Sequence, residues 1–281
     1  MTDGCQSIPA FSTTLTDVTH PSLTLANASD GRLLLHCKAG CTFIEVLGAL
    51  KLLGVVDATE RQPQSDLEAL ARAREADRRD AEKRAAQSAA CWSEARPIGG
   101  TIAETCLRAR GITCHLPPAL RFHPACWHPD AKRLPAMIAL VSGAARPAVH
   151  RTYLRQDGAG KAGDPAKAML GSVAGGAVRL SDATGPLVVA EGIETGLSLL
   201  SGLLPVPVTV WAALSTSGMK ALVLPSTPGR LKIASDGDDA GRAAAHALAT
   251  RACGLGWEVS LLPAPDGCDW NDVIMKNGAT A

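Results

Sequence analysis

Three acidic side chains in the C-terminal third of the sequence have the types and spacing suited to metal-assisted phosphate chemistry. Glu191 directly follows an apolar run at 187–190, and Asp236 and Asp238 directly follow a second run at 230–235. Alternate residues of an extended segment point the same way, so Asp236 and Asp238 can converge on one ion. Carboxylate oxygens are ligands that suit Mg²⁺ or Mn²⁺. The pattern therefore predicts a divalent-cation site.

The chemistry of such a site follows from its charges. Clustered carboxylates raise one another's pKa unless a cation neutralises them. A divalent ion held there can neutralise phosphate oxygens and orient in-line attack, while a further carboxylate moves a proton. Gly192 and Gly237 would let the backbone approach a phosphate closely. Each acidic motif alone could equally be a helix cap or a solvated turn, but their order along the chain favours phosphate chemistry.

A parallel sheet is needed to bring these acids together. The pattern predicts short buried strands alternating with two helices, over 187–190, 194–200, 206–211, 230–234, 241–252 and 257–262. In open α/β sheets, ligands bind beyond the carboxyl ends of the strands. We therefore expect an α/β domain over residues 185–281, with a parallel-rich sheet and helices on both faces.

The segments around the acids resemble the Toprim domain of primases carried by phages, plasmids and integrative elements. The resemblance covers roughly residues 185–275 and lies in 188–199, 211–215, 233–244 and 269–273. Toprim domains also occur in topoisomerases, nucleases and recombination mediators. The family resemblance implies that Glu191 is the general acid/base and that Asp236 and Asp238 hold the metal ion.

The Asp-Trp-Asn-Asp segment at 269–272 is common in the mobile-element primases. By the same resemblance Asp269 is a further candidate ligand for Mg²⁺, beside Glu191, Asp236 and Asp238. A capping role for Asn271 or Asp272 is an equal alternative to metal support.

The segment upstream of this domain holds candidate phosphate contacts. Residues 107–112, 120–124, 134–138 and 150–154 resemble the α+β subdomain that precedes Toprim in the same primases, where it helps form the groove for template and nucleotide. The patterns at 138–141 and 149–154 predict strands. The basic candidates are Arg108, Arg110, Arg121, His150, Arg151 and Lys161. For each of them, an ordinary surface position is an equal alternative.

The N-terminal residues resemble a damaged zinc module. Two strands near 22–26 and 32–36 and a helix starting at Thr42 are expected. Cys37 and Cys41 match the second ligand pair of the zinc module in these primases, whereas Thr13 and Thr16 stand where the first pair belongs. A structural zinc site needs four ligands. Zn²⁺ is therefore a doubtful cofactor, and thiols without metal are the alternative. Nearby substitutes at other spacings are Cys5, His20 and His36.

Four domains are expected. They are a degenerate zinc-ribbon-like module at 1–58, a charged helical linker at 59–96, a primase-type core subdomain at 97–184 and a Toprim catalytic domain at 185–281. Ser65 and Glu68 have capping-box spacing at the start of the linker helix. A further group of Cys and His side chains fits no zinc spacing and is interpreted as incidental: Cys114, His115, His123, Cys126 and His128.

Composition narrows the class of protein. The net charge of +1 excludes a global basic signature for nucleic acid, so any such binding needs a local basic face. No run approaches the roughly 18 apolar residues of a membrane span, and the N-terminal residues lack a secretion pattern. Nine cysteines without such a signal indicate metal binding or burial rather than a disulfide framework. A cytoplasmic protein without membrane partners is expected.

The leading functional hypothesis is a DNA primase that joins ribonucleoside triphosphates on a single-stranded DNA template. A Walker-type phosphate loop is absent from the sequence, so a separate replicative helicase is a candidate partner. The first alternative is a Toprim nuclease that hydrolyses phosphodiesters with the same acids. The second alternative is a non-catalytic protein that binds nucleic acid or acts as an inhibitor. Three clustered carboxylates would be of little use to such a protein.

Overall fold

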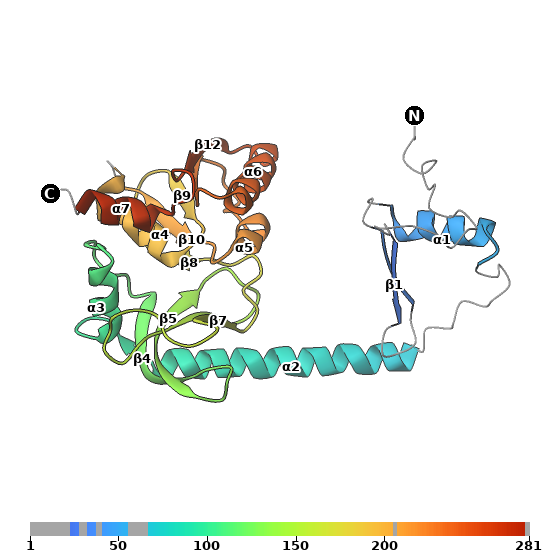
Figure 1. The fold of residues 1–281 in the computed structure, drawn as a ribbon, viewed down its shortest axis with the longest axis horizontal. Helices are drawn as coiled ribbons and strands as arrows, with labels where there is room; N and C mark the ends of the chain where they lie inside the picture. The colour runs from blue at the N-terminus through green and yellow to red at the C-terminus, as the bar shows by residue number, and fades with distance from the viewer. Residues whose placement is uncertain (1–22, 28–32, 38–40, 56–66, 205–206, 279–281) are drawn as a thin grey trace. The chain divides into compact units, whose positions relative to one another are not determined.

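The structure is a computed structural model that describes residues 23–27, 33–37, 41–55, 67–204 and 207–278 (Figure 1). The chain divides into two compact units, residues 1–74 and 75–281. Several positions of the sequence analysis lie outside the described residues or have side chains outside them: Cys5, Thr13, Thr16, His20, His36, Ser65 and Glu68.

The first unit contains the predicted hairpin and helix. Strands β1 (Leu23–Asn27) and β2 (Leu33–Cys37) pair antiparallel, with Leu25 opposite Leu35. Helix α1 (Phe43–Leu52) begins after Thr42, whose hydroxyl accepts from the Glu45 backbone N–H while the Glu45 carboxylate accepts from the Thr42 N–H. This reciprocal capping box confirms the predicted start of the helix.

Helix α2 (Leu67–Glu94) corresponds to the predicted charged helix. Its alanines favour helix strongly, and its charges pair along one face, with Arg78 bonded to both Glu75 and Glu82. Such exposed pairs contribute little to stability because solvent screens them. The last turns of α2 instead pack their buried residues, Cys91 among them, against the sheet that follows.

A five-stranded antiparallel sheet follows α2, with helix α3 (Ile102–Ala109) inserted after its first strand. In sheet order the strands are β3 (Arg96–Pro97), β4 (Leu120–Trp127), β5 (Arg133–Val141), β6 (Ala148–Tyr153) and β7 (Lys167–Leu170). The strands predicted at 138–141 and 149–154 are confirmed within β5 and β6. The pattern did not predict β3, β4, β7 or α3, because their apolar periods are short or interrupted by proline.

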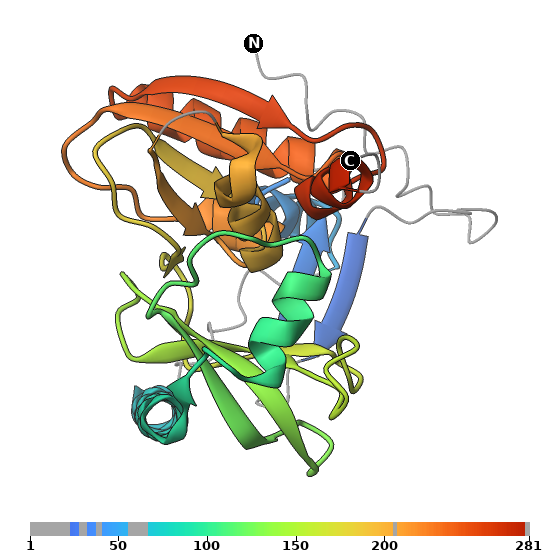
Figure 2. The same cartoon turned by 90° about the vertical axis from the view of Figure 1, so that its left-hand side faces the viewer.

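Alternation divides the side chains of this sheet between two faces. On β6, Val149, Arg151 and Tyr153 lie on the side of α2. His150 and Thr152 lie on the opposite side, against the parallel-sheet domain described next. Figure 2 looks along α2 and shows the antiparallel sheet beside it.

The C-terminal part of the second unit, here called the parallel-sheet domain, is the predicted α/β fold. Its sheet order is β12 (Glu258–Pro263), β11 (Arg230–Ser235), β9 (Leu187–Ala190), β10 (Thr209–Ala212) and β8 (Val178–Arg179). The first four strands are parallel, and β8 pairs antiparallel with β10 at one edge. The parallel strands confirm the prediction, whereas the short edge strand β8 was not predicted.

Helices cover both faces of this sheet (Figure 1). Helix α4 (Ile193–Ser198), continued by a π-helical turn at Leu199–Leu203, packs beside α7 (Trp270–Gly278), and α5 (Thr216–Ala221) packs beside α6 (Asp239–Gly254). The strand residues alternate accordingly: Val188 belongs to the core under α4, and Val189 to the core under α5 and α6.

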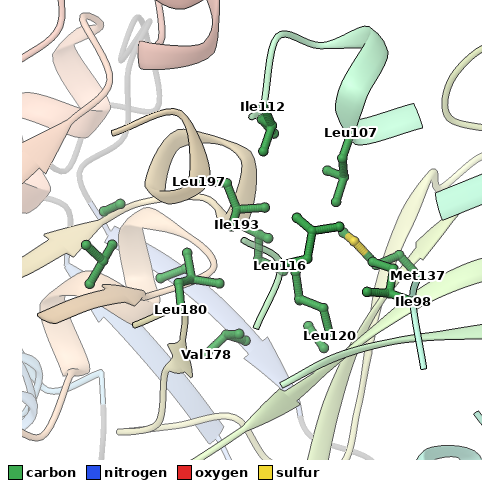
Figure 3. Close-up of a cluster of buried hydrophobic side chains, with 14 of the residues drawn as sticks. Ile98, Leu107, Ile112, Leu116, Leu120, Met137, Val178, Leu180, Ile193 and Leu197 are labelled. Carbon is green, nitrogen blue, oxygen red and sulfur yellow. The ribbon is translucent and has the colours of Figure 1, made fainter. Parts of the chain in front are cut away.

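One continuous apolar core joins the two sheets (Figure 3). Leu107, Leu120 and Met137 of the antiparallel part pack in the same cluster as Leu180 and Leu197 of the parallel-sheet domain. Buried apolar area of this kind contributes roughly 25 cal/mol per Å². The shared core therefore holds the antiparallel sheet against the domain that carries the acids.

Candidate active site

Glu191 and Asp236 lie at the carboxyl ends of two adjacent parallel strands. Ala190 of β9 stands opposite Ala234 of β11, so the residues that follow leave the sheet side by side. Burial raises the pKa of Glu191 to about 7, and the charges of Asp236 and Asp238 add to this effect. Glu191 Oε2 is buried without a hydrogen-bond partner. The site thus holds a carboxyl group that titrates near neutral pH.

Asp236 shares this environment. Burial raises its pKa, and the charge of Asp269 acts in the same direction, while a bond from Thr195 Oγ1 to Asp236 Oδ1 at 3.4 Å opposes them. The desolvated, mutually repelling carboxylates are the setting in which a bound cation gives the largest relief. This is the electrostatic arrangement expected from the sequence.

Two of the predicted acids also cap helices. Asp238 Oδ1 accepts from Gly241 N at 2.6 Å at the start of α6. Asp269 and Asp272 bond each other's backbone N–H at the start of α7, at 2.8 and 3.1 Å. In the part of the chain that the structure describes, no group of three or more His, Cys, Asp or Glu side chains is arranged to hold a metal ion. Asp238 and Asp269 thus each make a helix-capping bond, and the convergence of the acids on one ion stays a prediction.

The loop after β11 is closely packed against the segment before α7. Gly237 N donates to Cys268 O at 2.8 Å, and a Cβ at Gly237 would collide with the carbonyl of Pro265. A Cβ at Gly241 would lie 2.9 Å from Asp236 O. Glycine is required at both positions because the backbones approach so closely, and this contact brings Asp269 beside Asp236.

A lysine from the other sheet faces the acids, and the sequence analysis did not identify it. Lys167 on β7 stands opposite Thr152 of β6, on the side of the parallel-sheet domain. Lys167, Thr152 and His150 line a small cavity of about 20 Å³ together with Gly192 and Glu194. The charge of Lys167 lowers the pKa of both Glu191 and Asp236, whereas burial lowers the pKa of Lys167 itself.

Two of the predicted basic residues are held near Lys167 by Glu194. Glu194 is a second residue that the sequence did not suggest. Lys161 Nζ bonds Glu194 Oε2 at 2.7 Å, and Arg110 Nη2 lies 3.3 Å from the same oxygen. The Glu194 side chain is only 12% exposed. Glu194 therefore holds two cations close to the acid edge. Its position three residues after Glu191, at the start of α4, was the available signal.

His150 also lies in this region, but in a different electrostatic state. Burial lowers its pKa to about 4, and its Nδ1 is buried without a partner. A neutral imidazole can donate or accept one hydrogen bond at each nitrogen but contributes no positive charge. His150 is thus a neutral neighbour of the acids at pH 7.

The other three basic candidates lie away from the acids. Arg108 pairs with Glu104 and donates to two backbone carbonyls of residues 112 and 114. Arg121 donates to the Trp92 carbonyl and stacks on its ring. Arg151 donates to the carbonyls of residues 127 and 169 on the α2 side of the sheet. These three arginines stabilise the fold through hydrogen bonds to backbone carbonyls.

Asn271 connects three elements behind the site. Its amide donates to Arg110 O at 2.8 Å and to Ser198 Oγ at 3.0 Å, and the residue is 2% exposed. It therefore ties α7 to α4 and to the end of α3. Capping or metal support was expected for Asn271 or Asp272. Asp272 takes part in capping α7, and Asn271 bridges the two parts of the unit.

The zinc expectation receives no support from the described residues. Cys37 ends β2 and Cys41 precedes α1, and both are partly buried. Among the described side chains, the hairpin included, no group of three or more possible metal ligands is found. The described helices also contain none that is both long and apolar enough to cross a bilayer.

Two family models match the chain. Residues 186–280 match a family described as Toprim domain, and residues 82–180 match a family described as a domain of unknown function, DUF7146. A search of curated proteins finds no match. The boundaries predicted for the four domains stay predictions.

Solved primase structures are similar to the chain. A DNA primase domain from Pseudomonas aeruginosa is 17% identical, with 63% of this chain and 56% of that chain covered and a TM-score of 0.32. The primase fragment of the bacteriophage T7 primase-helicase protein is 19% identical, with 52% and 63% covered and a TM-score of 0.34. The RNA polymerase domain of Mycobacterium tuberculosis primase DnaG is 18% identical, with 65% and 60% covered and a TM-score of 0.31.

The chain thus spans about 56% to 63% of the length of these three structures. The domain match falls on the parallel-sheet domain and includes Glu191, Asp236, Asp238 and Asp269. The chain therefore carries a Toprim domain over residues 186–280.

Proposed function

We propose that the protein is a primase-like nucleotidyltransferase that joins ribonucleotides into short RNA primers on a single-stranded DNA template. The observation that carries this proposal is the acid edge of the Toprim domain, where Lys167 of the antiparallel sheet lies close enough to Glu191 and Asp236 for its charge to lower the pKa of both. Carboxylates next to a lysine suit a nucleoside triphosphate, because the carboxylates would bind a divalent cation and the lysine would bind the phosphates.

The donor set fits Mg²⁺ or Mn²⁺. Glu191 presents a buried, unpartnered Oε2, and burial together with neighbouring acids raises the pKa of both Glu191 and Asp236. We assign the ion to these two carboxylates, with Asp238 and Asp269 as adjoining donors. When bound, the ion would neutralise phosphate oxygens and favour in-line displacement of pyrophosphate.

The protein's own residues would supply binding and proton transfer. Lys167 would bind a phosphate oxygen of the incoming ribonucleotide, because its charge already acts on both Glu191 and Asp236. Lys161 and Arg110 would add positive charge beside it while Glu194 holds them in place. Glu191 would exchange a proton with the reacting hydroxyl, and in the absence of a cation its raised pKa shows how readily this carboxyl takes up a proton. A cytoplasmic setting and a separate helicase partner belong to the same proposal.

A primer-synthesis assay tests the proposal. Single-stranded DNA and labelled ribonucleoside triphosphates are incubated with Mg²⁺ or Mn²⁺ and the wild type, Asp236→Ala or Glu258→Ala. Glu258 is a matched control, since it begins β12 at the opposite edge of the same sheet. We expect metal-dependent oligoribonucleotides from the wild type and Glu258→Ala, and none from Asp236→Ala.

Other outcomes overturn the proposal. Metal-dependent shortening of the DNA, lost in Asp236→Ala, would assign the acids to a nuclease. Template binding without any turnover, unchanged in Asp236→Ala, would assign the chain to the non-catalytic class.

A further inference from the structure

A second chemical feature lies on the other face of the antiparallel sheet. Cys91 of α2 and Cys126 of β4 are both buried, and their Sγ atoms are 3.8 Å apart. A cavity of about 510 Å³ is lined by both thiols and by residues that include His123, Arg133 and Arg151. Two thiols from distant parts of the chain thus meet at the wall of a space large enough for small molecules.

The separation of the sulfurs suits covalent bonding. A disulfide has an S–S length of about 2.0 Å, so the sulfurs must approach by roughly 1.8 Å. Cys91 lies in the last turn of α2, and Cys126 lies where the pairing of β4 with β5 shifts register between residues 123 and 126. A helix end and an irregular strand segment adjust more easily than the interior of a regular ladder.

The charges around the pair favour one thiolate. The contact with Cys91 lowers the pKa of Cys126, the charge of Arg151 acts in the same direction, and burial opposes them. The same contact and burial raise the pKa of Cys91. Arg151 is a buried guanidinium whose Nε has no hydrogen-bond partner. The pair therefore consists of an activated thiol and a neighbouring thiol that keeps its proton.

The other titratable groups at the cavity leave this assignment in place. Glu94 at the end of α2 accepts a bond from His123 Nε2 at 3.1 Å, and His123 Nδ1 accepts from the Ala125 N–H. Arg133 stacks on the ring of Trp127. Glu94 is the one acid among the residues that line the cavity, and its charge acts on Cys91.

We propose that Cys91 and Cys126 are a redox-active dithiol, which a peroxide entering the cavity oxidises to a disulfide that ties α2 to β4. This inference is independent of the proposed primase activity. Its site shares no side chain with the acid edge and lies on the opposite face of the sheet from Lys167.

The reaction balances in two steps. The Cys126 thiolate attacks one oxygen of hydrogen peroxide, the O–O bond breaks, and the leaving hydroxide takes a proton to become water, which leaves a sulfenic acid. Cys91 sulfur then attacks Cys126 sulfur, the S–O bond breaks, and a second water leaves with the Cys91 proton. Two thiols are oxidised by two electrons and one peroxide is reduced.

Peptide mapping of the peroxide-treated full-length protein tests this site. We expect a linked peptide pair containing Cys91 and Cys126, reversed by dithiothreitol, in the wild type and in Cys106→Ser. Cys106 is a matched control because it is also buried in the same unit but lies on α3. The linked pair is absent from Cys91→Ser and Cys126→Ser. Circular dichroism of the reduced variants verifies that they are folded.

Rates and thermal unfolding give a second readout. We expect Cys126 to lose its free thiol at least tenfold faster than the exposed Cys253, and the Tm of the oxidised wild type to rise by several degrees. In Cys91→Ala, Cys126 should stop at the sulfenic acid and the Tm should not rise. Oxidation of Cys126 to sulfinic acid in the wild type without any linkage, or reaction no faster than that of Cys253, would overturn the proposal.

Discussion

The two sheets of the second unit place their functional side chains by different rules. The parallel sheet carries its acids at strand ends, where Glu191 and Asp236 follow β9 and β11. The antiparallel sheet carries Lys167 and Cys126 within strands. Successive side chains there alternate between the face toward the acids and the face toward α2. The end of a strand can be predicted from the sequence, whereas the face on which a side chain lies depends on which strands pair and in what register.

The difference also separates two functions within one sheet. The face toward the Toprim domain holds Lys167 and His150 near the acids, and the face toward α2 holds Arg151 and Cys126, which meets Cys91 of α2. A substitution on one face should leave the chemistry of the other intact. That separation is testable by substitutions on each face of the sheet.

The largest effect is expected at a strand end. Glu191→Gln removes proton transfer and one donor for the cation while keeping the size of the side chain, so primer synthesis should fall by about 10² to 10⁴-fold. Steady-state primer synthesis measures the loss. Glu258→Gln, at the other edge of the sheet, should remain near wild type, and an equal loss there would show that the acid edge has no special role.

The next effect is expected on the face toward the acids. Lys167→Met keeps the aliphatic stem and removes a charged donor to phosphate, so kcat/KM for ribonucleotides should fall by roughly 10- to 100-fold. Arg133→Met removes a cation from the other side of the same sheet and should have little effect on the same measurement. Equal losses in both variants would contradict the division between faces.

A smaller effect is expected where the two parts of the unit meet. Asn271→Ala breaks the buried bonds to Arg110 O and Ser198 Oγ and should lower the unfolding free energy by about 1–3 kcal/mol. Urea denaturation measures the change. Ser198→Ala serves as the second arm of a double-mutant cycle, and fully additive losses would show that the two side chains act independently.

The smallest effect is a pH dependence at the acid edge in the absence of divalent ions. The pKa of Glu191 is raised from 4.5 to about 7, so its protonated form contributes stability that is fully present below pH 4.5 and lost as pH rises through 7. With a chelator present, the wild type should lose on the order of 1 kcal/mol more than Glu191→Gln between pH 5 and 8, after allowance for solvent screening. Identical pH profiles would contradict the raised pKa.

Local pattern was enough for much of the fold. The strands that became β9 and β11, the capping box of α1 and the long charged helix follow from apolar runs, cap spacing and alanine content, all of which act within a few residues. The acids at strand ends follow as well, because the carboxyl ends of parallel strands meet at one edge of a sheet.

Which basic residues face the acids depends on strand pairing between distant segments. Arg121 and Arg151 lie one residue out of phase with His150 and Lys167, and the pairing of Thr152 with Lys167 joins segments that no local pattern connects. Packing of the last turn of α2 on the antiparallel sheet likewise brings Cys91 to Cys126, thirty-five residues away. Face and register depend on long-range strand pairing and on the shared core. Local sequence was therefore enough to predict the acids, whereas the basic residues beside them follow from tertiary packing.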